Sequence, residues 1–208
     1  MISLLNVSKN FKGMDVVDGV SLDIHDGMIF GLRGQNGSGK TTLLRIMSGL
    51  VVPTRGSVVV DGITINPGGK VPDSMGALID SPGFLARYSG LENLMFLASL
   101  GEEFSKEDAC SILSQCGLDP TSKQAYRKYS LGMKQRLGIA AAFVSNPRNI
   151  LLDEPTNGLD ASGPKMLDSL ILGAKQRGAC IVIASHDEVF LRKYCDAVAT
   201  IEAGRLAL

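Results

Sequence analysis

Residues 34–42 read GQNGSGKTT, and this glycine-rich stretch sets narrow limits on how the chain can fold. The apolar run 28–32 precedes it, and apolar residues at three- and four-residue spacing follow it over 40–50. The pattern G-x-x-x-x-G-K-T between a strand and a helix is typical of a loop that surrounds phosphate groups. Its glycines let backbone N–H groups approach phosphate oxygens, and the N-terminus of the following helix adds partial positive charge.

The loop is therefore expected to bind a nucleotide together with Mg²⁺. Lys40 would reach the β- and γ-phosphates, and the Thr41 hydroxyl would coordinate Mg²⁺. The residues expected to contact the nucleotide are Gly34, Gln35, Asn36, Gly37, Ser38, Gly39, Lys40, Thr41 and Thr42. A glycine-rich turn that matches the pattern by accident is the alternative, and it leaves the flanking strand and helix unexplained.

Short apolar runs recur along the chain, rich in Val, Ile and Leu and without polar alternation. Runs of this kind predict strands that are covered on both faces, as in a parallel α/β sheet. They occupy residues 2–7, 20–24, 28–32, 57–60, 77–79, 150–152, 181–184 and 197–201. Helical patterns over 40–50, 165–175 and 188–193 alternate with them, so the sequence predicts an α/β fold.

The region 82–147 differs, because it has helical patterns and almost no strand-like sequence. Helices are predicted over 91–100, 106–116 and 131–145. Ser105 and Asp108 have the spacing of a capping box, and Ser130 is a candidate N-cap. Strand patterns resume afterwards. The chain is therefore interpreted as one domain, residues 1–208, with an α/β core (1–81 and 148–208) and an inserted helical subdomain (82–147).

Composition excludes several classes of protein. The chain has 208 residues with 21 basic and 21 acidic side chains, so a surface that is basic throughout and binds nucleic acid is not expected. The four cysteines form no CxxC pair and no zinc spacing, which predicts reduced thiols in a cytosolic protein. The N-terminus lacks a signal-peptide pattern, and the longest apolar run, 137–144, is far below the ~18–20 residues that span a bilayer.

Two carboxylates end the apolar run in ILLDE, residues 150–154. Because strand side chains alternate, Asp153 and Glu154 point in different directions and can have different roles. At the carboxyl end of a strand both would lie beside Lys40 and Thr41. Asp153 fits a Mg²⁺ partner, through water, and Glu154 fits the group that polarises the attacking water. A solvated strand end is the alternative for the pair taken alone.

With these motifs, the chain resembles the nucleotide-binding subunit of an ABC transporter over its whole length. DEPTNGLD (153–160) is typical of that family, YSLGMKQR (129–136) stands at its signature, and IVIASHD places His186 at its switch histidine. The resemblance implies a P-loop NTPase core with a mostly parallel sheet, an N-terminal antiparallel β portion and an inserted helical subdomain. It implies catalytic roles for Lys40, Glu154 and His186.

The resemblance also implies further nucleotide contacts. Phe11 would stack on adenine, Ser130 and Gly132 would form an anion site at a helix start, and Asp160 would lie at a dimer seam. Each has a simpler alternative: a core aromatic for Phe11, a helix cap for Ser130, a loop residue for His186. Asp80 occupies a hinge position where the family usually has Gln, and it is expected to bind Mg²⁺ directly or through water.

Partners follow from the same resemblance. Ser130 lies in the helical region, away from Lys40, so two chains arranged head to tail would each complete the other's ATP site. An integral membrane permease would dock near residues 80–89, which places the chain in the cytoplasm, peripheral on the inner face of the cell membrane. Asp80 and YSLGMKQR resemble the bacterial subgroup that exports peptide antibiotics such as bacitracin and lantibiotics.

Three alternatives stay open: an ABC-type ATPase acting on nucleic acid or ribosomes, an ATP-binding module that does not hydrolyse, and import in place of export. A single cassette without heptads or net positive charge disfavours nucleic acid as a partner.

Overall fold

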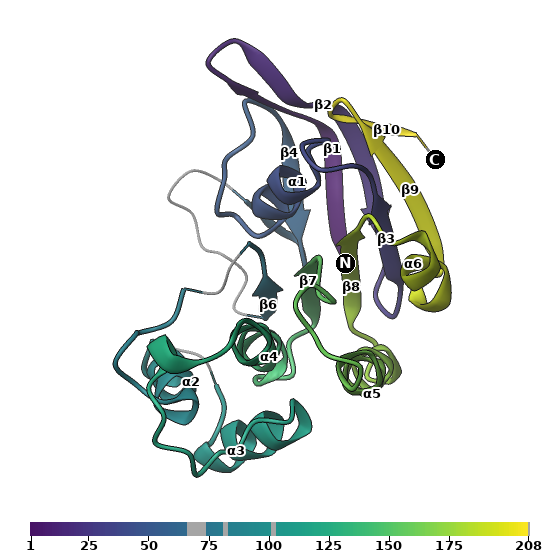
Figure 1. Cartoon of the computed structure of the whole chain (residues 1–208). Helices are drawn as coiled ribbons and strands as arrows, with labels where there is room; N and C mark the ends of the chain where they lie inside the picture. The colour runs from purple at the N-terminus through teal and green to yellow at the C-terminus, as the bar shows by residue number, and fades with distance from the viewer. Residues whose placement is uncertain (66–73, 81–82, 101–102, 208) are drawn as a thin grey trace.

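The computed structural model describes residues 1–65, 74–80, 83–100 and 103–207, and these form two sheets with helices packed around them (Figure 1). The larger sheet has the strand order β10-β9-β3-β8-β7-β6, and all neighbours are parallel except β9 and β10. Its strands are β3 (Ile29–Arg33), β6 (Met75–Leu78), β7 (Asn149–Asp153), β8 (Cys180–Ser185), β9 (Ala197–Glu202) and β10 (Arg205–Ala207).

The smaller sheet is antiparallel, with the order β2-β1-β4-β5. It consists of β1 (Ile2–Phe11), β2 (Met14–Ile24), β4 (Arg55–Val60) and β5 (Ile63–Thr64). Three of the predicted runs, 2–7, 20–24 and 57–60, therefore belong to this antiparallel portion and not to the parallel sheet.

Helix α1 (Lys40–Met47) lies between the two sheets and contacts both. One apolar core forms there: Leu43 and Leu44 pack with the smaller sheet and with one face of the larger, including Val182 of β8. Side chains on the opposite face of β8, such as Ile181 and Ile183, belong to a second core with the remaining helices. The alternating sides of one buried strand thus hold the layers together.

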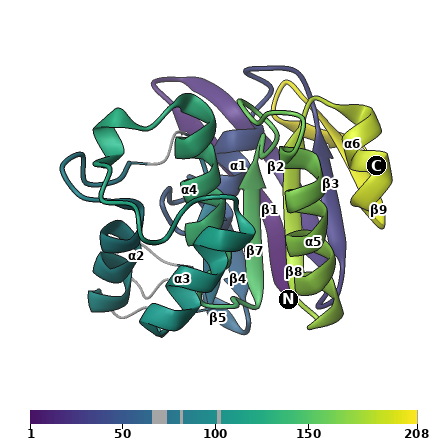
Figure 2. The ribbon, with the colours of Figure 1, turned by 60° about the horizontal axis from the view of Figure 1, so that its bottom comes forward.

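The second core is covered by α4 (Leu131–Phe143), α5 (Gly163–Gln176) and α6 (Glu188–Tyr194), while α2 (Gly90–Ser99), α3 (Lys106–Gln115) and the short 3₁₀ helix η1 (Tyr126–Lys128) extend to one side (Figure 2). Both α2 and α3 begin with capping boxes, Ser89–Glu92 and Ser105–Asp108. The Ser130 hydroxyl accepts from the Met133 N–H and caps α4.

The predicted fold class is confirmed, with local differences. The strands β5 and β10 and the helix η1 were not predicted, because segments of two or three residues show no periodicity. The helix predicted over 40–50 ends at Met47, since Gly49 turns the chain with φ 77°, and the helix predicted over 131–145 ends at Phe143.

The division into core and helical subdomain stays a prediction. The boundary expected at 81–82 lies outside the described residues. Helix α4 contacts β6 and β7, so the predicted insertion shares its packing with the sheet.

No helix in the described part of the chain is long and apolar enough to cross a membrane. All four cysteines are free thiols. Burial raises the pKa of Cys116, Cys180 and Cys195 to about 12, so these three are poor nucleophiles.

Candidate functional site

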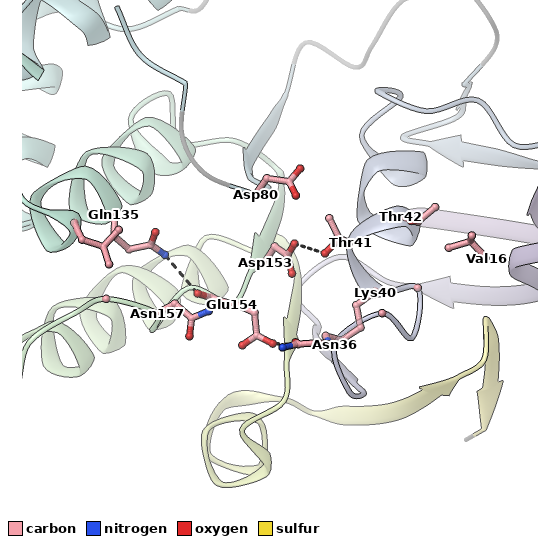
Figure 3. Close-up of a pocket in the computed structure, with 14 residues that line it drawn as sticks. Val16, Asn36, Lys40, Thr41, Thr42, Asp80, Gln135, Asp153, Glu154 and Asn157 are labelled. Carbon is pink, nitrogen blue, oxygen red and sulfur yellow. Dashed lines mark hydrogen bonds and ion pairs between the residues drawn. The ribbon is translucent and has the colours of Figure 1, made fainter. Parts of the chain in front are cut away.

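A cleft of about 530 Å³ opens at the carboxyl end of the larger sheet, between α1 and the start of α4 (Figure 3). Its lining consists of Val16, Asn36, Gly37, Gly39, Lys40, Thr41, Thr42, Asp80, Leu131, Gln135, Asp153, Glu154, Asn157 and Gly158. The glycine-rich loop and both carboxylates of ILLDE therefore meet in one place.

The loop between β3 and α1 has a backbone conformation that requires glycine. Gly39, at the N-cap of α1, has φ 111°, and a Cβ there would lie 2.5 Å from the Val16 carbonyl oxygen. Only glycine fits, which keeps the helix N-terminus free to face the cleft. Lys40 is buried and donates from Nζ to the carbonyl oxygens of Gly34 at 2.6 Å and Gln35 at 3.0 Å.

Not every residue of this loop lines the cleft. Gly34, Gln35 and Ser38 line a second cavity of about 570 Å³, together with His186 and residues 200–203. The Ser38 hydroxyl is buried and has no hydrogen-bond partner among the described residues.

Thr41 and Asp153 form the metal-side pair. The Thr41 Oγ1 donates to Asp153 Oδ2 at 2.6 Å, and Asp153 Oδ1 is buried and accepts no hydrogen bond in the described part of the chain. Burial raises the pKa of Asp153, and the charges of Glu154 and Asp80 raise it further. Mg²⁺ in nucleotide sites is coordinated by one or two protein oxygens plus substrate phosphate. A buried carboxylate oxygen without a hydrogen bond, next to a hydroxyl, fits this kind of coordination. The described residues contain no group of three or more His, Cys, Asp or Glu side chains that could hold a metal ion.

Glu154 points to the other side of the cleft. It leaves the strand with φ 44°, a left-handed conformation that is costly for a residue with a side chain. Its carboxylate accepts from the Ser185 hydroxyl and from the His186 backbone N–H, both at 3.0 Å, and lies 3.9 Å from Lys40 Nζ. The His186 Nδ1 is 3.0 Å from both carboxylate oxygens, so His186 contacts the predicted base directly.

The start of α4 borders the cleft through other residues than those predicted. Leu131 and Gln135 line it, whereas Ser130 is exposed and Gly132 packs beneath the Gly158 carbonyl, where a Cβ would approach to 2.9 Å. Ser130 and Gly132 thus lie outside the cleft of their own chain.

Asp160 is exposed and lies outside the cleft. Its Oδ1 accepts from Arg136 Nη2 at 2.7 Å and from the Ser162 hydroxyl at 2.8 Å. These hydrogen bonds, Ser162 first and Arg136 second, lower the pKa of Asp160.

Two other predicted residues have unexpected neighbours. Phe11 lies at the end of β1, and Lys9 Nζ is 5.0 Å from the centre of its ring. Phe11 does not line the cleft, whereas Val16 of β2 does. Asp80 does line the cleft, but its Oδ2 accepts from Arg45 Nε at 2.9 Å.

Several residues of the site escaped the sequence prediction. Gln135 donates to the Pro155 carbonyl at 3.2 Å and joins α4 to the turn after Glu154. Both Gln135 and Asn157 stand inside the stretches YSLGMKQR and DEPTNGLD, so their motifs were the available signal. Ser185 stands in IVIASHD, directly before His186. Val16 and Arg45 lie in no motif, and only the folded chain brings them to the site.

Fold and cleft together have the arrangement of a P-loop NTPase, in which the glycine-rich loop between β3 and α1 faces the carboxylates at the end of β7. The model of the ABC transporter family matches residues 17–157, and the chain belongs to that family.

Known relatives agree with this assignment. The chain is 40% identical over 206 residues to the uncharacterized ABC transporter ATP-binding protein YybJ of Bacillus subtilis, covering 99% of this chain and 94% of the relative. It is 36% identical to the bacitracin transport ATP-binding protein BcrA of Enterococcus faecalis, covering 99% of this chain and 68% of that one. A dimeric post-hydrolysis state of the ATP-binding cassette MJ0796 bound to ADP and Pi superposes with a TM-score of 0.88 at 27% identity, covering 100% of this chain and 97% of that one.

Proposed function

We propose that this chain hydrolyses ATP as one of two subunits that power a membrane transporter, and that the cargo is a peptide antibiotic or a similar compound. The observation that carries the proposal is the convergence of Lys40, the Thr41–Asp153 pair and Glu154 on one cleft (Figure 3). The bacitracin relative supports the cargo class, because it is similar over nearly the whole of this chain.

In this mechanism the chain's own groups bind and orient the triphosphate. The loop amides and Lys40 hold the phosphates, after Lys40 gives up its bonds to the Gly34 and Gln35 carbonyls. Thr41 and Asp153 would hold Mg²⁺, which neutralises charge that develops on the phosphates. Asp80, which the sequence predicts as a further metal-side residue, lines the same cleft, and its Oδ2 accepts from Arg45 Nε.

Glu154 would accept a proton from the attacking water. The Ser185 hydroxyl and the His186 backbone N–H each donate to one of its oxygens and hold the carboxylate in place, and a remaining lone pair would accept from the water. His186 would contact the terminal phosphate from the same edge.

A second chain would complete the site. Ser130 and Gly132 lie outside their own cleft, and the exposed helix start at Ser130 can face the phosphate of a partner. The dimeric cassette MJ0796 supports this assembly. Asp160 would lie at the seam, and Phe11 would stack on adenine.

A membrane permease is the proposed second partner, and it would hold the chain at the cytoplasmic face of the membrane. A cavity of about 340 Å³ between β6, α2 and α4 supports docking of a permease segment. Of the expected docking region 80–89, residues 81–82 lie outside the described part.

Phosphate release by the purified chain tests the catalytic part. Wild type should hydrolyse ATP in the presence of Mg²⁺, and Lys40→Ala should lose binding or hydrolysis, with the exposed Lys123→Ala as control. Normal binding and normal turnover in Lys40→Ala contradict the assignment. A pull-down from detergent extracts tests the partner, and recovery of no integral membrane protein argues against a transporter.

A further inference from the structure

Arg45 connects the phosphate-loop helix to the chain that leaves β6. It lies four residues after Thr41 on α1, so both side chains project from the same side of that helix. Arg45 Nε donates to Asp80 Oδ2 at 2.9 Å, and Nη2 donates to the same oxygen. Asp80 has φ 59°, a conformation that a residue with a Cβ seldom adopts unless its surroundings hold it.

The ion pair between Arg45 and Asp80 lies among the other charged groups of the cleft. Asp80, Asp153 and Glu154 all line the cleft. Asp80 follows β6 and Asp153 ends β7, and these parallel strands pair at Leu78 and Leu152. Asp80 and Asp153 therefore leave the sheet at neighbouring positions. Lys40 Nζ lies 3.9 Å from Glu154, and Arg45 forms the ion pair with Asp80.

We propose that Arg45 is a positioning residue for ATP turnover: it binds Asp80 to α1 and fixes where the chain leaves the sheet toward α2. Asp80 then acts through Arg45 and not as a metal ligand. The inference rests on the proposed ATPase function and deepens it, because it couples the helix that carries Lys40 and Thr41 to the segment that leads into the helical region.

A fluorescent reporter can detect this coupling without nucleotide. The chain contains no Trp, and Phe84 follows β6 closely and packs edge-on against Tyr126, with ring centres 5.4 Å apart. In a Phe84→Trp background, Arg45→Gln and Asp80→Asn remove either partner. Gln suits a helix and Asn tolerates positive φ, so neither change should disturb folding.

We expect Arg45→Gln, Asp80→Asn and the double variant to shift the Trp emission of the nucleotide-free chain by the same amount. Each should also lower ATP turnover by the same factor, about two- to fivefold, the size expected for an exposed ion pair. Arg192→Gln removes another exposed arginine–carboxylate pair, with Glu188, and should change neither quantity.

Two outcomes overturn the proposal. One is emission that stays unchanged in Arg45→Gln. The other is a loss of turnover in Asp80→Asn that Arg45→Gln does not share, which would make Asp80 a metal-side group in its own right. If wild type does not hydrolyse ATP, the proposed function fails, and the emission of the nucleotide-free variants still decides whether the pair positions the segment.

Discussion

At the scale of single residues, Glu154 combines an unfavourable backbone conformation with a carboxylate that accepts a hydrogen bond at each oxygen. Its φ of 44° is maintained by the hydrogen bond from its own N–H to the Ala184 carbonyl at 2.8 Å.

The substitution Glu154→Gln keeps the shape of the side chain but removes the carboxylate that accepts a proton. We expect ATP turnover to fall by roughly 10²–10⁴-fold, the range for a lost general base, while nucleotide binding persists. Phosphate release measures the first and equilibrium binding the second. Glu107→Gln, on the exposed start of α3, is the control, and unchanged turnover in Glu154→Gln removes Glu154 from its role.

Asp153 illustrates a conflict between stability and function at one residue. Burial raises its pKa, so ionisation costs the folded state more than the unfolded state. The free energy of unfolding therefore decreases as pH rises from about 4 through the raised pKa. We expect Asp153→Asn to raise the Tm of the nucleotide-free chain at pH 7 and to lose that advantage near pH 4. Thermal unfolding at both pH values checks this, with exposed Asp15→Asn as the control. A Tm at pH 7 that stays the same or decreases contradicts it.

At the scale of elements, Arg136 links three segments. Its Nη1 donates to the Cys116 carbonyl at the end of α3 at 2.7 Å, and Nη2 donates to Asp160 and Ser162 before α5. The Cys116 carbonyl is the costly partner to lose, because it is buried, whereas Asp160 is exposed. Arg136→Met should therefore destabilise the chain by about 1.5–3 kcal/mol, the value for a hydrogen bond to a charged group.

Urea unfolding distinguishes the two contacts of Arg136. Asp160→Asn should have a far smaller effect than Arg136→Met, and the exposed Arg127→Met should have almost none. Equal losses in Arg136→Met and Asp160→Asn would show that the surface ion pair, and not the buried carbonyl, holds these elements together.

The same elements show what local sequence can and cannot predict. The phosphate loop, the capping box at Ser105 and the N-cap at Ser130 are encoded within a few residues, and the structure has each of these local features. Contacts between distant segments leave no local pattern. Arg45 meets Asp80 across 35 positions and Gln135 meets Pro155 across 20, so neither partner was predictable from spacing.

At the scale of the whole molecule, the residues proposed for one phosphate site lie in two separate places on the chain. Lys40 and Glu154 share the cleft, but Ser130 is exposed outside it at the start of α4. In the proposed dimer, the cleft of one chain would supply one part of a phosphate site, and the exposed start of α4 of the other chain would supply the second part. Assembly of two chains around two nucleotides would join these parts, which predicts that dimerisation depends on ATP and is sensitive to a charge introduced at position 130.

Ser130→Asp tests that dependence with little change in folding. Asp is as good an N-cap as Ser, so α4 should remain intact, but its negative charge would repel the terminal phosphate of the partner's nucleotide. In a Glu154→Gln background, which should retain ATP because turnover is slow, we expect sedimentation to show a dimer with ATP and a monomer after Ser130→Asp. Each Ser130→Asp chain should still bind ATP. Ser114→Asp, exposed on α3, should dimerise normally. An ATP-dependent dimer that survives Ser130→Asp would place α4 away from the shared phosphate and leave the cleft as the whole site.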